Sequence, residues 1–93
     1  MVNAVLIRSL IAERVALSPN HPGVIDYWDK IAAEFKAHSL SDVIAFLNSC
    51  TADELGWISE VVDELLHHFE APMMDFLVEL DRKYPEADIG SQL

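Results

Sequence analysis

The sequence predicts an all-α fold, a compact bundle of four to five short helices, and three observations favour it. Apolar residues recur three and four positions apart along most of the chain, as they do on one face of an α-helix. No segment alternates apolar and polar residues in the way a half-buried strand would. With 93 residues, 52% of them hydrophobic, the chain can build a single core. We therefore expect one helical domain over residues 1–88 and a frayed tail over residues 89–93.

Two helices are expected in the first part of the chain. The first should cover residues 2–17, an apolar stretch that is interrupted by few charged residues. Residues 18–23 contain two prolines and a glycine, which cannot continue a helix and should end it. The second helix should cover residues 24–37, where an apolar stripe lies opposite charged residues. That stripe consists of Val24, Trp28, Ile31 and Phe35.

Three further helices are expected after them. A short one should begin at Ser41, a suitable N-cap, and end near Cys50. Thr51 and Glu54 form the pattern of a capping box, which predicts a long helix over residues 52–69. Its buried seam should consist of Leu55, Ile58, Val62, Leu65 and Phe69. Pro72 suits the first turn of a last helix, which Tyr84 and Pro85 end.

The charge of the chain is strongly one-sided. It has 16 acids and six bases, a formal net charge of −10. Residues 37–81 contain no Lys or Arg, and their acids are Asp42, Asp53, Glu54, Glu60, Asp63, Glu64, Glu70, Asp75, Glu79 and Asp81. This excess disfavours direct binding to nucleic acid or to an anionic membrane, because both need clustered bases. It favours a basic protein as the partner.

The best candidate for a binding site is the outer face of the long helix. A row of acids beside a partly buried aromatic side chain is the pattern expected of a hot spot for a basic protein. The residues expected to contact the partner are Trp57, Glu60, Asp63, Glu64 and His67, supported by Asp53 and Glu70, with Asp26 and Tyr27 as further candidates. On this helix Glu60, Asp63, His67 and Glu70 should lie opposite the buried seam. A merely solvated acidic face is the alternative.

Other chemistries find less support in the sequence. Glu64 and His67 form an E-x-x-H motif followed by His68, which raises the alternative of a metal-binding bundle. Di-iron bundles, however, need two such motifs and two further inward Glu residues, so we expect no metal and no cofactor. General acid catalysis needs a carboxyl group in a dry pocket, which an exposed helix face does not provide, and we expect no enzymatic activity.

The single cysteine and the N-terminal stretch indicate the cellular compartment in which the protein is expected. Cys50 is alone, so no internal disulfide can form, and we expect a buried, inert thiol in a reducing environment. Arg8, Glu13 and Arg14 interrupt the apolar stretch at the N-terminus, which fits neither a signal peptide nor a membrane-spanning helix. The sequence therefore predicts a cytoplasmic protein. It leaves open whether the first helix is covered within the fold or in a homodimer.

Two motifs carry a family resemblance. Residues 54–62, Glu-Leu-Gly-Trp-Ile-Ser-Glu-Val-Val, are followed at residues 83–86 by Lys-Tyr-Pro-Glu. This stretch, about residues 40–88, resembles the small acidic immunity proteins of contact-dependent growth inhibition and Rhs-type toxin systems. The resemblance implies a stoichiometric inhibitor that binds a cognate basic toxin domain, usually a nuclease. The alternative that shares the same acidic face is an adaptor or nucleic-acid mimic that binds another basic protein.

Overall fold

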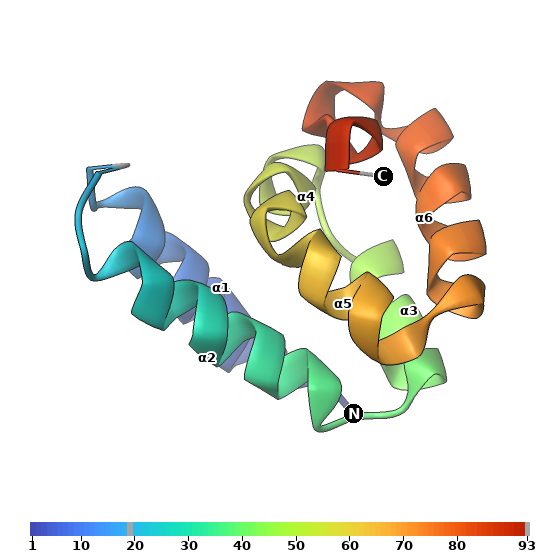
Figure 1. The fold of residues 1–93 in the computed structure, drawn as a ribbon, viewed down its shortest axis with the longest axis horizontal. Helices are drawn as coiled ribbons and strands as arrows, with labels where there is room; N and C mark the ends of the chain where they lie inside the picture. The colour runs from blue at the N-terminus through green and yellow to red at the C-terminus, as the bar shows by residue number, and fades with distance from the viewer. Residues whose placement is uncertain (19, 93) are drawn as a thin grey trace.

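The chain folds as a helical hairpin packed against a group of shorter helices. The computed structural model describes residues 1–18 and 20–92. Helices α1 (Ala4–Val15) and α2 (Val24–Lys36) form what we call the N-terminal hairpin, at the left of Figure 1. The remainder, which we call the acidic body, comprises α3 (Leu40–Asn48), α4 (Ala52–Ile58), η1 (Ser59–Val61), α5 (Val62–Phe69), α6 (Ala71–Lys83), η2 (Pro85–Ala87) and η3 (Ile89–Gln92). No strand occurs in the part of the chain that is described, and the all-α prediction is confirmed.

One core joins the hairpin to the acidic body. The most buried side chains come from both parts, and Ile7, Phe35, Val43, Leu65 and Met73 are each fully enclosed. The rings of Phe35 and Phe46 pack with their centroids 5.8 Å apart. Burial of this apolar surface is the main favourable contribution to folding. The predicted seam is confirmed from Leu55 to Leu65, whereas Phe69 at its end is half-buried.

The helix starts follow the sequence closely, with one difference. Thr51 and Glu54 form the predicted capping box, in which each side chain accepts a backbone N–H of the other residue. Helix α3, however, is capped by Ser39 and not by Ser41. The Ser39 backbone is extended, and its hydroxyl oxygen accepts the N–H of Asp42 at 3.2 Å. Ser41 lies inside the first turn of the helix, where its own side chain cannot cap.

Removing the Thr51 cap tests this local account. The variant Thr51→Ala is expected to lower the free energy of unfolding by about 1 kcal/mol, because the Glu54 N–H at the start of α4 loses the hydroxyl that accepts it. Urea denaturation measures the change. Ser41→Ala is the matched control, and we expect it to stay within about 0.5 kcal/mol of the wild type. Equal effects of the two substitutions would contradict the assigned caps.

The long helix predicted over residues 52–69 is interrupted, so a continuous helix was the wrong prediction. A 3₁₀ turn, η1, separates α4 from α5. The Ser59 hydroxyl donates a 2.6 Å hydrogen bond to the Gly56 carbonyl, and Ser59 and Val61 are both buried. A 3₁₀ turn advances about 20° more per residue than an α-helix, so it rotates the side chains that follow it. The outer face of α5 therefore does not continue that of α4.

The C-terminal segment is packed, and the predicted frayed tail over residues 89–93 is wrong for its first residues. Ile89 is 2% exposed and belongs to the core, as does Ala87 before it. The Gly90 N–H donates to a carboxylate oxygen of Asp81 at 2.9 Å, which ties the segment to α6. The physical reason is that the apolar side chain of Ile89 is buried where η3 packs against α6, α5 and η1. Leu93 lies outside the described residues.

Candidate functional site

Among the described residues, three side-chain ion pairs connect the helices of the N-terminal hairpin to the acidic body. Arg8 binds Glu54 at 2.6 Å, and Lys36 binds Glu64 at 2.8 Å. The third pair joins Arg14 to Glu60, with a shortest distance of 2.7 Å. Acids from residues 37–81, which contain no Lys or Arg, are thus paired with bases of the hairpin. The hairpin is held across α4, η1 and α5 by charge as well as by apolar packing.

These contacts also set the acidity of two of the carboxyl groups. Burial by itself would raise the pKa of Glu54, but hydrogen bonds from the Thr51 backbone and from Arg8 outweigh it and lower that pKa below its ordinary value. The hydrogen bond from Lys36 likewise lowers the pKa of Glu64. Both side chains are therefore held in the charged form that their ion pairs require.

The pair between Arg14 and Glu60 is the most enclosed of the three. Arg14 is only 5% exposed, and its guanidinium donates two hydrogen bonds to the Glu60 carboxylate, at 3.0 and 2.7 Å. The Trp28 indole N–H donates a third, at 3.0 Å. The same guanidinium lies over the Trp57 ring, 5.2 Å from its centroid. Glu60, Arg14 and two tryptophans thus form one connected cluster with every buried polar atom satisfied in the described chain.

This cluster corrects the predicted position of Glu60. The sequence placed its side chain on the outer face beside Asp63, but η1 turns it toward the hairpin. Its carboxylate is occupied by partners from α1 and α2. Arg14 and Trp28 were missed as functional residues. A signal for Arg14 exists, because it stands seven residues after Ile7 on the buried face of α1, where a charge needs a partner.

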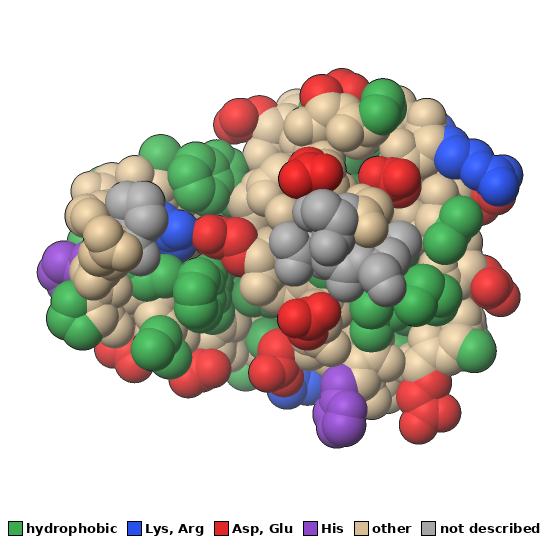
Figure 2. Space-filling model, turned by 45° about the horizontal axis from the view of Figure 1, so that its top comes forward, with side chains coloured by type: hydrophobic (Ala, Val, Ile, Leu, Met, Phe, Trp, Pro, Cys, Tyr) green, Lys and Arg blue, Asp and Glu red, His purple; other side chains and the backbone are tan. Residues whose placement is uncertain are grey.

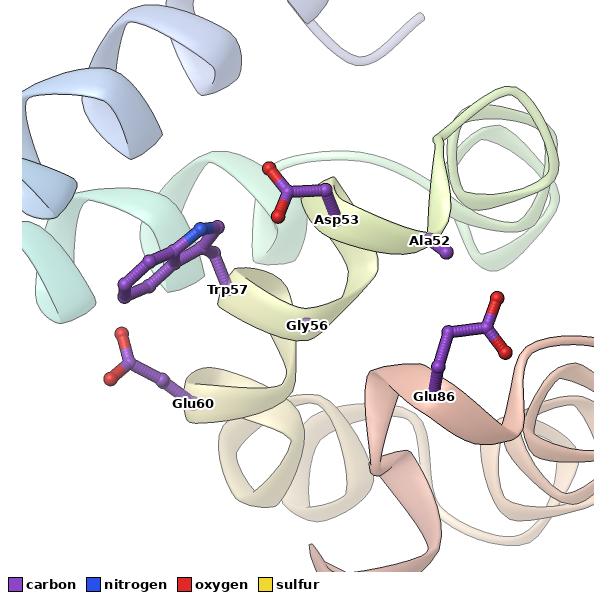
Figure 3. Close-up of a pocket in the computed structure, with 6 residues that line it drawn as sticks. All are labelled: Ala52, Asp53, Gly56, Trp57, Glu60 and Glu86. Carbon is purple, nitrogen blue, oxygen red and sulfur yellow. The ribbon is translucent and has the colours of Figure 1, made fainter.

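An open hollow lies beside this cluster (Figure 3). Its volume is about 520 Å³, and its lining residues are Ala52, Asp53, Gly56, Trp57, Glu60 and Glu86. Asp53 and Trp57 come from α4, and Glu86 reaches across from η2 toward the start of α4. Gly56 lines the hollow without a side chain, and a Cβ atom there would have the Ala87 carbonyl oxygen as its nearest neighbour, at an ordinary contact distance of 4.0 Å. Glu86 is a lining residue that the sequence reasoning missed.

Of the three acids that line the hollow, two have no ion-pair partner among the described residues. Asp53 and Glu86 are exposed, and within residues 1–18 and 20–92 neither forms an ion pair. Trp57 is half-buried, as expected from the sequence. One side of its ring is covered by Arg14. The hollow thus combines an aromatic wall with two carboxylates that have no cation to neutralise them.

The other predicted contact residues are distributed more widely. Asp63, His67 and Glu70 are exposed on or just after α5, as expected, and Glu64 is exposed but paired with Lys36. They do not line the hollow. Figure 2 shows acidic side chains spread over the visible face of the molecule, with few bases among them.

The two candidates at the start of α2 lie on the hairpin. Asp26 is exposed, and Tyr27 is half-buried with the Lys30 ammonium 5.5 Å from its ring centroid. Neither residue lines the hollow beside Trp57. The structure therefore brings together Asp53, Trp57 and Glu60, and leaves Asp26 and Tyr27 outside that group.

The metal-binding alternative finds no support in the geometry. In the described part of the chain, no three His, Cys, Asp or Glu side chains lie close enough together to hold a metal ion. The exposed histidines His67 and His68 are part of no such group, although Glu64 lies one turn away. The nearest His–carboxylate contact is between His38 and Glu34, at 2.7 Å, and it links neighbouring turns of one segment.

Cys50 is buried, as predicted, and burial raises the pKa of its thiol to about 12. At pH 8 only about one thiol in ten thousand would be ionised, and the thiolate is the reactive form. A thiol reagent should therefore label the native protein far more slowly than the protein unfolded in urea. Rapid labelling of the native state at the rate of an exposed thiol would contradict this account. Mass spectrometry over time measures both rates.

Wider comparisons identify no relative. No protein-family model, no curated protein and no solved structure matches the chain. Within residues 1–18 and 20–92, no helix combines the length and the apolar character needed to cross a lipid bilayer. The function is therefore inferred from the arrangement of the residues themselves.

Proposed function

We propose that the protein is a non-catalytic inhibitor that binds and neutralises a basic toxin domain, usually a nuclease, as the immunity proteins it resembles do. The observation that carries the proposal is the uneven distribution of charge. Residues 1–36 hold four acids (Glu13, Asp26, Asp29, Glu34) and four bases (Arg8, Arg14, Lys30, Lys36). The other 12 of the 16 acids and two of the six bases follow, so residues 37–93 carry the whole net charge of −10.

The internal ion pairs occupy most of the bases of the N-terminal hairpin. Arg8, Arg14 and Lys36 are engaged by acids of the acidic body, so they cannot mask the remaining acids. An acidic surface that is not interspersed with bases costs self-repulsion in the isolated protein. A basic partner relieves that repulsion. This supports a function in which the surface is covered by a cationic protein.

The hollow supports a specific mode of contact. A Lys or Arg side chain entering it would meet the carboxylates of Asp53 and Glu86 and the ring of Trp57. Charge-assisted hydrogen bonds and a cation–π contact would then hold the same group. Aromatic residues in partly enclosed positions often carry much of the binding energy of an interface. A nuclease offers such cations, because it must bind phosphates.

Speed of association is a second requirement that the charge can meet. An inhibitor protects a cell only if it captures its target quickly. Attraction between oppositely charged surfaces can raise association rates by orders of magnitude. The net charge of −10 on 93 residues is well suited to this purpose.

The test uses the polypeptide encoded by the reading frame next to that of this protein, which we call the neighbour-encoded polypeptide. Expressed alone, its C-terminal domain should arrest growth, and co-expression of this protein should restore it. The two purified proteins should form a stable complex at about 100 mM salt. Growth that is not restored, or the absence of a complex, would contradict the proposal.

A further inference from the structure

The junction between α5 and α6 has an unusual backbone conformation. Glu70 has φ 62° and ψ −142°, and it ends α5 and begins α6 at the same time. Its N–H donates to the Leu66 carbonyl at 2.9 Å, and its own carbonyl accepts the N–H groups of Met73 and Met74. In Figure 1 the chain reverses its direction at this point. The conformation therefore serves the turn between the two helices.

That conformation is one that glycine adopts readily and that other residues avoid. A Cβ atom collides with the neighbouring backbone when φ is positive and ψ is near −142°. Among the described residues, Asp88 is the other non-glycine residue with positive φ, at 59°. Its ψ of 33° places it in the left-handed helical region, which Asp tolerates. Glu70 is thus the more strained of the two.

Within the described chain, the Glu70 side chain makes no contact that would offset this strain. It is exposed, and it forms neither a hydrogen bond nor an ion pair with the other described residues. The hydrogen bonds at the junction are all made by the Glu70 backbone, which a glycine would supply equally well. A glycine would therefore serve the isolated chain better at this position.

We propose that Glu70 is retained at the expense of stability because its carboxylate binds a Lys or Arg side chain of the basic partner. This rests on the proposed function. The residue lies between two helices whose ends it hydrogen-bonds, so its backbone is held in place before binding. Because the backbone is ordered before binding, association costs only the conformational entropy of the Glu70 side chain. Asp63, on the helix that precedes it, is a further exposed acid in this part of the chain.

Two substitutions separate the strain from the charge. Glu70→Gly removes both, and Glu70→Gln removes only the charge. Glu70→Gly should raise the urea midpoint of unfolding by about 1 M, and Glu70→Gln should leave it unchanged. Both should raise the Kd for the neighbour-encoded polypeptide roughly tenfold at about 100 mM salt. The matched control is Asp75→Asn, an exposed acid in α6, which should raise the Kd less than about twofold.

Each other outcome overturns the inference. If Glu70→Gly does not stabilise the protein, the backbone of Glu70 is not strained. If both variants bind as tightly as the wild type, the side chain is not a contact. If Asp75→Asn weakens binding as much as they do, only the overall charge matters. Failure of the wild type to bind the neighbour-encoded polypeptide is a separate result, because it contradicts the proposed function itself.

Discussion

Replacing Glu60 with alanine is expected to lower the free energy of unfolding by about 3 kcal/mol or more. The substitution leaves the guanidinium of Arg14 without its carboxylate in a site where only 5% of the residue is exposed. It also removes the acceptor of the Trp28 indole N–H. An uncompensated buried charge costs far more than the loss of an exposed ion pair. Urea denaturation followed by circular dichroism measures the change.

A matched exposed pair provides the control for Glu60. Glu79 and Arg82 form an ion pair at 2.9 Å, but their side chains are 66% and 71% exposed. Glu79→Ala should therefore change the free energy of unfolding by less than about 0.5 kcal/mol. The double variant Glu60→Gln with Arg14→Met should recover part of the stability, because it buries no unpaired charge. Similar effects of Glu60→Ala and Glu79→Ala would contradict the account of this cluster.

Reversing the charge at the rim of the hollow is expected to have the largest effect on binding. The double variant Asp53→Lys with Glu86→Lys should raise the Kd for the neighbour-encoded polypeptide about 100-fold at low salt. Two carboxylates that lack internal cations are replaced by cations that repel the incoming Lys or Arg. Both positions are exposed, so the urea midpoint should fall only slightly, because Lys at position 53 is unfavourable in the first turn of α4. Surface plasmon resonance measures the binding.

The control for this variant has the same net charge. Glu13→Lys with Asp29→Lys changes two exposed acids of the N-terminal hairpin, which lie outside the hollow. We expect it to raise the Kd less than about tenfold, through the long-range field alone. Equal losses in the two double variants would mean that the hollow has no special role. No loss in either would mean that the acidic surface is not the binding surface.

Much of the fold could be predicted because its signals are local. The Thr51 capping box, Pro72 in the first turn of α6 and the seam from Leu55 to Leu65 all depend on residues within a few positions of one another. The break in the helix at η1 has no such local signal. Ser59 and Val61 are compatible with a continuous helix, and their burial against the rest of the fold decides the geometry.

The candidate site could be predicted only in part, for a related reason. Asp53 and Trp57 lie on one helical stretch, so their proximity follows from the helical period. The partner of Glu60 is 46 residues away in α1, and no periodicity reveals such a pair. Glu86 joins the hollow only because η2 packs against α4, in a segment that the sequence placed close to a frayed tail.

The most direct test of the proposed electrostatic capture is the salt dependence of association. Stopped-flow mixing of the wild-type protein with the neighbour-encoded polypeptide gives the association rate constant at about 50 mM and about 500 mM NaCl. We predict that the rate constant falls at least about tenfold over this range, because screening weakens the attraction between the acidic body and a basic partner. An association rate constant that does not change with salt would contradict the proposed electrostatic capture.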